Sequence, residues 1–178
     1  MAKAMDVASF FIEALGGSND PMTNLRLNKL VYFAQVWSLV RLGEPLFDEP
    51  MEAWKLGPVV VSVYSRYSGY EKKAIEEHDE YDIDVFSDEQ KEILVDVARE
   101  YRRYSTSALV DLSHCAGGPW DRVHDENIKR KIEYEDILEH YSKEEPLPRF
   151  DPSKIPKGRI ISKRDEKGRL VLPRDFDD

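Results

Sequence analysis

The chain contains one cysteine and four histidines, which are the first candidates for metal binding or nucleophilic catalysis. His114 and Cys115 are adjacent, His124 follows closely, and His78 and His140 are remote in sequence. Zinc sites usually carry paired ligands with the spacing C-x-x-C or H-x-x-x-H, and neither spacing occurs. A single cysteine at a helix end is usually a small buried side chain. The sequence therefore predicts no metal site and no catalytic residue. His114 keeps two interpretations, an imidazole that binds the carbonyl groups of a helix end or a contact with a partner.

Carboxylates are concentrated in residues 76–92, which we call the acidic stretch and which hold a single basic residue, Lys91. Catalytic carboxylates must converge in a protected site, whereas this stretch has little periodicity and is expected to be exposed. It is either a solvated loop or a surface that attracts a basic partner. Motifs for nucleotide binding, dinucleotide binding, serine hydrolysis and zinc proteolysis do not occur. The sequence thus predicts that the protein is not an enzyme and needs no cofactor.

Aromatic residues gather just before the acidic stretch. Trp54 and the Gly57-Pro58-Val59 segment could fill the core and begin a helix, since proline is favoured at the first helical position. Alternatively they form part of an interface, because Trp, Tyr and Arg contribute most to protein–protein binding. The residues predicted to contact a partner are Trp54, Pro58, Tyr64, Arg66, Tyr67, Tyr70, Glu76, Glu77, Asp79 and Glu80.

These candidates must be positioned by a helical scaffold. Residues 24–42 predict one helix that is apolar around most of its circumference, with Thr23 as N-cap and Gly43 at its end. Such a helix must be covered on several sides. The predicted fold is therefore mainly α, a compact bundle of about five to six helices around the buried central helix 24–42.

The other expected elements follow from caps, breakers and periodicity. Residues 51–56 could run extended, 81–86 could form a short strand, and 121–132 are predicted to be a polar loop. Further helices are expected at 4–15, 57–69, 87–104, 105–117 and 134–142.

Prolines in quick succession after residue 145 predict a boundary between a helical domain, 1–145, and a Pro-rich linker with a C-terminal arm, 146–178. Residues 158–173 of the arm could form a short β-hairpin. The net charge of −9 is uneven: residues 151–178 hold eight basic and six acidic residues, and the other 150 residues carry a balance of −11. This acidic body disfavours binding to nucleic acid.

The single cysteine, an N-terminus without a long apolar run and apolar segments interrupted by charge predict a cytoplasmic protein with no membrane span. Homo-oligomer formation stays open.

The segment Asn-Lys-Leu-Val-Tyr-Phe-Ala-Gln-Val-Trp at 28–37 resembles the signature of Panacea-domain proteins, a family that includes SocA-like antitoxins and GepA-like phage-associated proteins. Asn28 stands where the commonest family version has Gln. Roughly residues 5–145 share the family's order of motifs, and the matching residues are interpreted as structural: Lys29, Leu30, Tyr32, Phe33, Gln35, Trp37, Trp54, Gly57, Pro58, Val59, His114 and Trp120.

The resemblance implies an antitoxin of a toxin–antitoxin pair, often carried by prophages, which neutralises a separately encoded toxin by direct protein contact. Two alternatives stay open. One is a proteolytic adaptor that delivers the toxin to a AAA+ protease. The other is a DNA-binding regulator that uses the C-terminal tail.

Overall fold

The structure is a computed structural model, and it describes residues 1–16, 20–141, 163–164 and 170–171. Within them the chain is mainly helical, with seven α-helices rather than the five to six expected. The elements are α1 (Ala4–Leu15), α2 (Asn24–Leu42), β1 (Met51–Trp54), β2 (Gly57–Val60), α3 (Val61–Tyr67), the 3-10 helices η1 (Ser68–Tyr70) and η2 (Ile83–Val85), α4 (Asp88–Tyr101), α5 (Thr106–Ser113), α6 (Pro119–Val123), β3 (Lys131–Ile132), α7 (Tyr134–His140), β4 (Lys163–Arg164) and β5 (Leu170–Val171).

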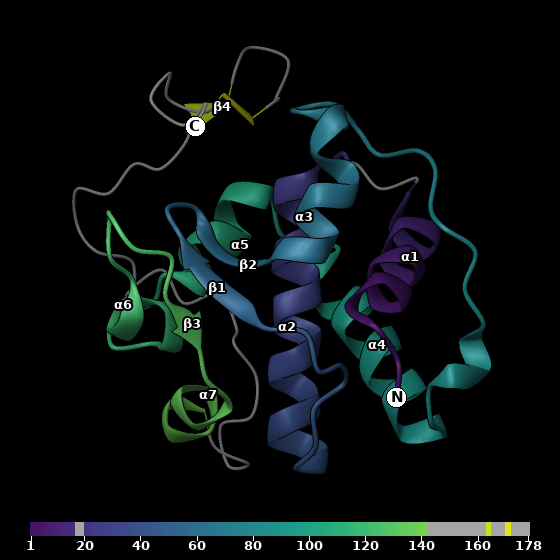
Figure 1. Cartoon of the computed structure of the whole chain (residues 1–178). Coiled ribbons are helices and arrows are strands. Elements are labelled where there is room, and N and C mark those ends of the chain that lie inside the picture. Colours follow the sequence, from purple (N-terminus) through teal and green to yellow (C-terminus); the bar gives the residue numbers. More distant parts are fainter. Residues whose placement is uncertain (17–19, 142–162, 165–169, 172–178) are drawn as a thin grey trace.

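Helix α2 runs through the middle of the molecule, with α1 and α4 on one side and the small sheet, α6 and α7 on the other (Figure 1). Its bounds are those predicted. The Thr23 side chain accepts a hydrogen bond from the amide of Arg26, and Gly43 ends the helix in the left-handed conformation at φ 76°. Nearly all of its residues from Asn24 to Val40 are buried, as expected for a helix that is apolar around most of its circumference.

The sheet was not expected from the sequence. It has the strand order β2-β1-β3 and is antiparallel throughout, with Met51 opposite both Val60 of β2 and Ile132 of β3. The extended segment expected at 51–56 is thus confirmed for Met51–Trp54, which form β1, whereas residues 55–56 form the turn to β2. Because β3 is only two residues long and lies among charged residues, alternation could not reveal it, and the predicted 121–132 loop is wrong at both of its ends.

The predicted start of the next helix at Gly57-Pro58 is also wrong, because this segment is β2 and the helix, α3, begins at Val61. Gly57 has φ 105°, which a helix does not allow. Ala53, which pairs with Pro58, donates its amide to the Arg130 carbonyl on the β3 side of the sheet. The ladder between β1 and β2 therefore needs no N–H at position 58, where proline has none to give.

Two further expectations fail for local reasons. The strand predicted at 81–86 is the 3-10 helix η2, closed by the Asp82 carboxylate, which accepts from the amide of Asp84. Helix α4 ends at Tyr101 rather than at Tyr104. The carbonyls of both tyrosines accept hydrogen bonds from the buried guanidinium of Arg26.

In the arm, β4 pairs antiparallel with β5 inside the predicted hairpin range. The rest of that hairpin, the Pro-rich linker and the predicted boundary at residue 145 lie outside the described residues. In the described part of the chain, no helix is both long and apolar enough to cross a membrane.

Candidate protein-binding surface

Polar side chains of α2 hold the outer edge of β2. The Lys29 ammonium donates to the Pro58 carbonyl at 2.7 Å, and the Val60 amide donates to the Asn28 side-chain oxygen at 3.0 Å. These backbone groups face away from β1, so the side chains take the place of a neighbouring strand. Lys29 is fully buried, and this burial lowers its pKa to about 7.

Gly57 makes this close approach possible. A Cβ atom at this position would lie 2.6 Å from the Ser113 hydroxyl and 2.8 Å from Cε of Lys29. Asn24, one turn before Asn28, donates to the carbonyl of Tyr64 at 2.9 Å. Helix α2 therefore fixes both β2 and the following α3.

Gln35 performs a similar function two turns after Asn28 on α2. Its side-chain amide donates to the Phe47 carbonyl at 2.8 Å, and its oxygen accepts from the Leu46 amide at 2.8 Å. The Tyr134 hydroxyl also donates to the Phe47 carbonyl, at 3.0 Å. The irregular loop before β1 is thus held on α2 and α7.

The remaining α2 motif residues are in the core. Trp37 donates its indole N–H to the Tyr101 hydroxyl at 3.0 Å, and the Phe33 ring stacks on Tyr101 with centroids 4.7 Å apart. Burial raises the pKa of Tyr101 well above its ordinary value, so this hydroxyl stays protonated and available as a donor and acceptor. Three further motif residues are buried as well: Leu30 and Tyr32 of α2 and Val59 of β2.

Trp54 lies half-buried at the end of β1. Its N–H donates to the Glu52 carboxylate at 2.7 Å, and its ring packs on Tyr64 with centroids 4.8 Å apart and an interplanar angle of 59°. The Lys129 ammonium lies 3.7 Å from the centroid of the indole. We call Glu52, Trp54, Tyr64 and Lys129 the Trp54 cluster. Glu52 and Lys129 were not among the predicted residues. Glu52 lies two positions before Trp54 on the same strand, whereas Lys129 reaches Trp54 only through the fold.

The Trp54 cluster is anchored from behind by Trp120. The Trp120 indole donates to the Trp54 carbonyl at 2.7 Å. Its ring is stacked between His114, at 3.6 Å between centroids, and His124, at 4.2 Å. His114 is buried at the C-terminal end of α5, and its imidazole stacks on the Trp120 ring. Pro119 and Trp120 begin α6, since proline is favoured at the first helical position.

The predicted contact residues divide into exposed and buried ones. Arg66 and Asp79 form a bidentate ion pair, with Arg66 Nη2 2.6 Å from Asp79 Oδ1, which lowers the pKa of Asp79. This pair ties the acidic stretch to α3. Pro58 and Tyr67 are buried and Tyr70 is half-buried, so these three support the surface more than they form it. The carboxylates of the predicted set that are exposed are Glu76, Glu77 and Glu80.

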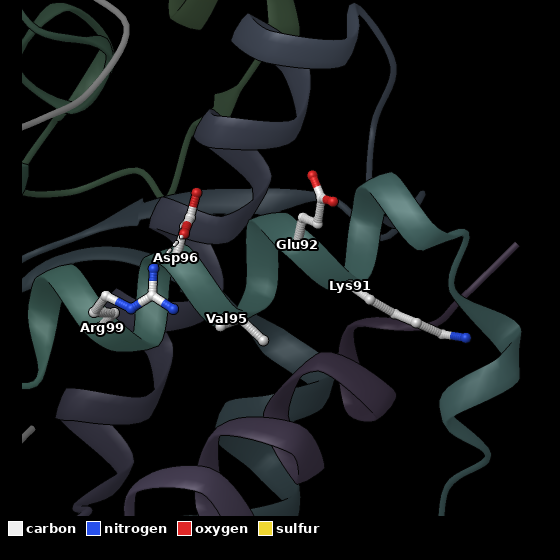
Figure 2. A pocket seen from close by; sticks show the side chains of 5 residues that line it. All are labelled: Lys91, Glu92, Val95, Asp96 and Arg99. Atoms are coloured by element: carbon white, nitrogen blue, oxygen red, sulfur yellow. Dashed lines mark hydrogen bonds and ion pairs between the residues drawn. The ribbon is translucent and has the colours of Figure 1, made fainter.

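A concave part of the surface lies away from the predicted contact residues, on α4. A depression of about 400 Å³ lies on the outer side of α4, and Figure 2 shows that the five residues lining it all come from this one helix. Val95, 44% exposed, is the apolar member among charged neighbours. In the described residues, no group of three or more His, Cys, Asp or Glu side chains is placed to hold a metal ion. The fold does bring His140 to Cys115, with the imidazole Nε2 3.4 Å from the sulfur.

Comparisons with known proteins agree on one family. Residues 27–121 match the family model of the SocA-like antitoxin Panacea domain. The chain is 35% identical over 130 residues to antitoxin SocA of Caulobacter vibrioides, an alignment that covers 67% of this chain and 69% of that protein. No solved structure matches the chain.

Proposed function

The chain belongs to the Panacea-domain family of SocA-like antitoxins, and from this membership we propose that it is the antitoxin of a toxin–antitoxin pair. It acts as a binding protein rather than as an enzyme, and it neutralises a separately encoded toxin by direct contact. The observation that carries the proposal is the 35% identity to antitoxin SocA over 130 residues.

The proposed contact surface includes the Trp54 cluster, the exposed side of α3 and the acidic stretch. Tyr64 is 37% exposed and Val61 of the same helix is 36% exposed, next to a half-buried tryptophan. Large aromatic side chains on a rigid support are the usual centres of protein interfaces. The Arg66–Asp79 ion pair holds the carboxylates of the acidic stretch close to this aromatic group, which suits a toxin with a basic face. We propose further that residues 1–145 form the toxin-binding domain and that the arm, 146–178, adds to the contact.

Co-expression tests the proposal directly. The polypeptide encoded beside this chain's gene should arrest growth when expressed alone, and expression of the antitoxin should restore growth. Purification of the tagged antitoxin should recover the toxin in a complex. A neighbouring polypeptide that is harmless alone would refute the antitoxin assignment.

A pair of matched variants tests the surface. Tyr64→Ser should weaken toxin binding by about thirtyfold, as expected for loss of an aromatic interface centre. Val95→Ser removes an apolar side chain of similar exposure on α4 and should leave binding unchanged. Equal effects of the two substitutions would place the contact elsewhere.

The fate of the toxin separates two modes of neutralisation. An antitoxin that occludes the toxin leaves its half-life unchanged or lengthens it. An adaptor that delivers the toxin to a AAA+ protease shortens the half-life. A pulse-chase measurement of toxin with and without the antitoxin therefore distinguishes the two modes.

A further inference from the structure

The indole of Trp54 is held in place before any partner arrives. Its N–H is bound to Glu52, its ring packs on Tyr64, and its backbone carbonyl is bound to Trp120. Contacts from β1 and α3 therefore fix the indole, and a contact from α6 fixes the backbone that carries it. Little side-chain entropy of Trp54 remains to be lost when a ligand binds to its ring.

That ring already carries a cation. The Lys129 ammonium lies 3.7 Å from the indole centroid, whereas the next two basic residues, Arg130 and Lys131, form ion pairs with carboxylates. The Glu52 carboxylate beside the indole adds negative charge to the site. The fold thus contains a cation-binding site made of an aromatic ring and a neighbouring carboxylate. Its present occupant is a long, exposed side chain on the 124–130 loop, which water can readily displace from the ring.

Resting on the proposed function, we propose that the toxin places an arginine side chain on this face of Trp54, in exchange for Lys129. The planar guanidinium stacks on the indole and is less strongly hydrated than an ammonium group. It also reaches the Glu52 carboxylate with N–H groups, as a charge-assisted hydrogen bond. Because one cation replaces another, the exchange adds no repulsion at the site, and the released Lys129 is screened by water and salt.

Substitutions of Lys129 test this exchange because they predict effects of opposite sign. Lys129→Met removes the competing positive charge from the ring and should tighten binding of an arginine ligand by about two- to fivefold. Lys129→Arg places a stronger competitor on the ring and should weaken binding by a similar factor. Lys131→Met removes the same charge from a nearby position that does not contact the ring, so it controls for general electrostatics.

The probe is a hexa-arginine peptide, with hexa-citrulline as its uncharged counterpart. The Trp54 indole N–H resonance, assigned with Trp54→Phe, should shift with hexa-arginine and not with hexa-citrulline. Equal effects of Lys129→Met and Lys131→Met, a Lys129→Arg variant that binds like the wild type, or an equal shift with hexa-citrulline would each overturn the proposal.

The cognate toxin should show the same order of affinities, and Trp54→Leu should weaken its binding more than tenfold. Near-UV circular dichroism and the urea midpoint verify that this variant is folded. If the chain neutralises the toxin but the Lys129 series and Trp54→Leu all bind it like the wild type, the arginine site is refuted and the antitoxin function stands. If hexa-arginine follows the predicted order but no neighbouring polypeptide is toxic, the antitoxin function is refuted and the cation site stands.

Discussion

Lys29 provides the sharpest test of how the motif residues support the fold. Its side chain is fully buried between α2 and β2, its ammonium donates to the Pro58 carbonyl at 2.7 Å, and burial lowers its pKa to about 7. The ordinary value of 10.5 applies to the unfolded chain. Between pH 7 and 10.5 the unfolded state therefore binds more protons, so this residue's contribution to stability becomes more favourable as pH rises through that range. Well below pH 7 the Lys29 side chain is protonated in both the folded and the unfolded state, so the free-energy cost of burying its charge no longer changes with pH.

The magnitude follows from the two pKa values. The gap between 10.5 and about 7 corresponds to about 5 kcal/mol, at about 1.4 kcal/mol for each tenfold change in the proton equilibrium. Lys29→Met keeps the length of the side chain and removes this penalty, but it leaves the Pro58 carbonyl without its donor at a cost of about 1–3 kcal/mol. We expect the variant to be more stable than the wild type at pH 6, by about 2–4 kcal/mol.

The difference between the two proteins should then shrink by about 3 kcal/mol between pH 7 and 9.5, because only the wild type gains stability from this residue. Urea unfolding at several pH values, followed by tryptophan fluorescence and circular dichroism, measures both free energies. The exposed Lys131→Met substitution controls for loss of one positive charge and should give a curve parallel to that of the wild type. Parallel curves for Lys29→Met and the wild type would refute the burial argument.

Four other substitutions probe the same scaffold. Gly57→Ala should lower the free energy of unfolding by at least about 2 kcal/mol, since it adds a clash to a positive φ, whereas Gly43→Ala, which has a positive φ and open space, should cost about 1 kcal/mol in the same urea assay. Gln35→Leu should cost about 1–3 kcal/mol because the Leu46 amide loses its acceptor while the Phe47 carbonyl keeps only the Tyr134 hydroxyl, and faster amide exchange in that loop should accompany the loss. Asp20→Ala should lower stability by about 3 kcal/mol, measured by the urea midpoint, since its carboxylate pairs with a fully buried guanidinium of α2.

The local signals in the sequence were sufficient for the helices that begin and end at strong caps. Helix α2 has the predicted bounds because Thr23 and Gly43 act through their own side chain and backbone. Ser87 likewise begins α4 at the predicted position, with a capping box to Gln90. Such interactions join residues three or four positions apart, so their partners can be found in the sequence itself.

The sheet and the Trp54 cluster depend on contacts between distant residues. Proline at position 58 fits a helix start and an edge strand equally well, and the choice depends on Lys29 and Asn28 reaching the edge of β2. Lys129 lies 75 positions after Trp54 and reaches it only because β3 pairs with β1. No periodicity in either segment indicates that pairing.

The polar motif residues of α2 explain why a helix in the middle of the core is not purely apolar. Asn28, Lys29 and Gln35 each bind backbone groups of β2 or of the loop before β1, groups that no neighbouring strand satisfies. An apolar replacement of Asn28 or Gln35 would leave these groups buried without a partner, at a greater cost than burying the uncharged amide side chain together with them. For Lys29 the balance is reversed below about pH 7, because the cost of burying its positive charge exceeds the cost of leaving the Pro58 carbonyl without a donor. One face of α2 thus serves in place of a further strand for a three-stranded sheet. Because β1 of that sheet also carries Trp54, the same hydrogen bonds hold the proposed toxin-binding surface in position.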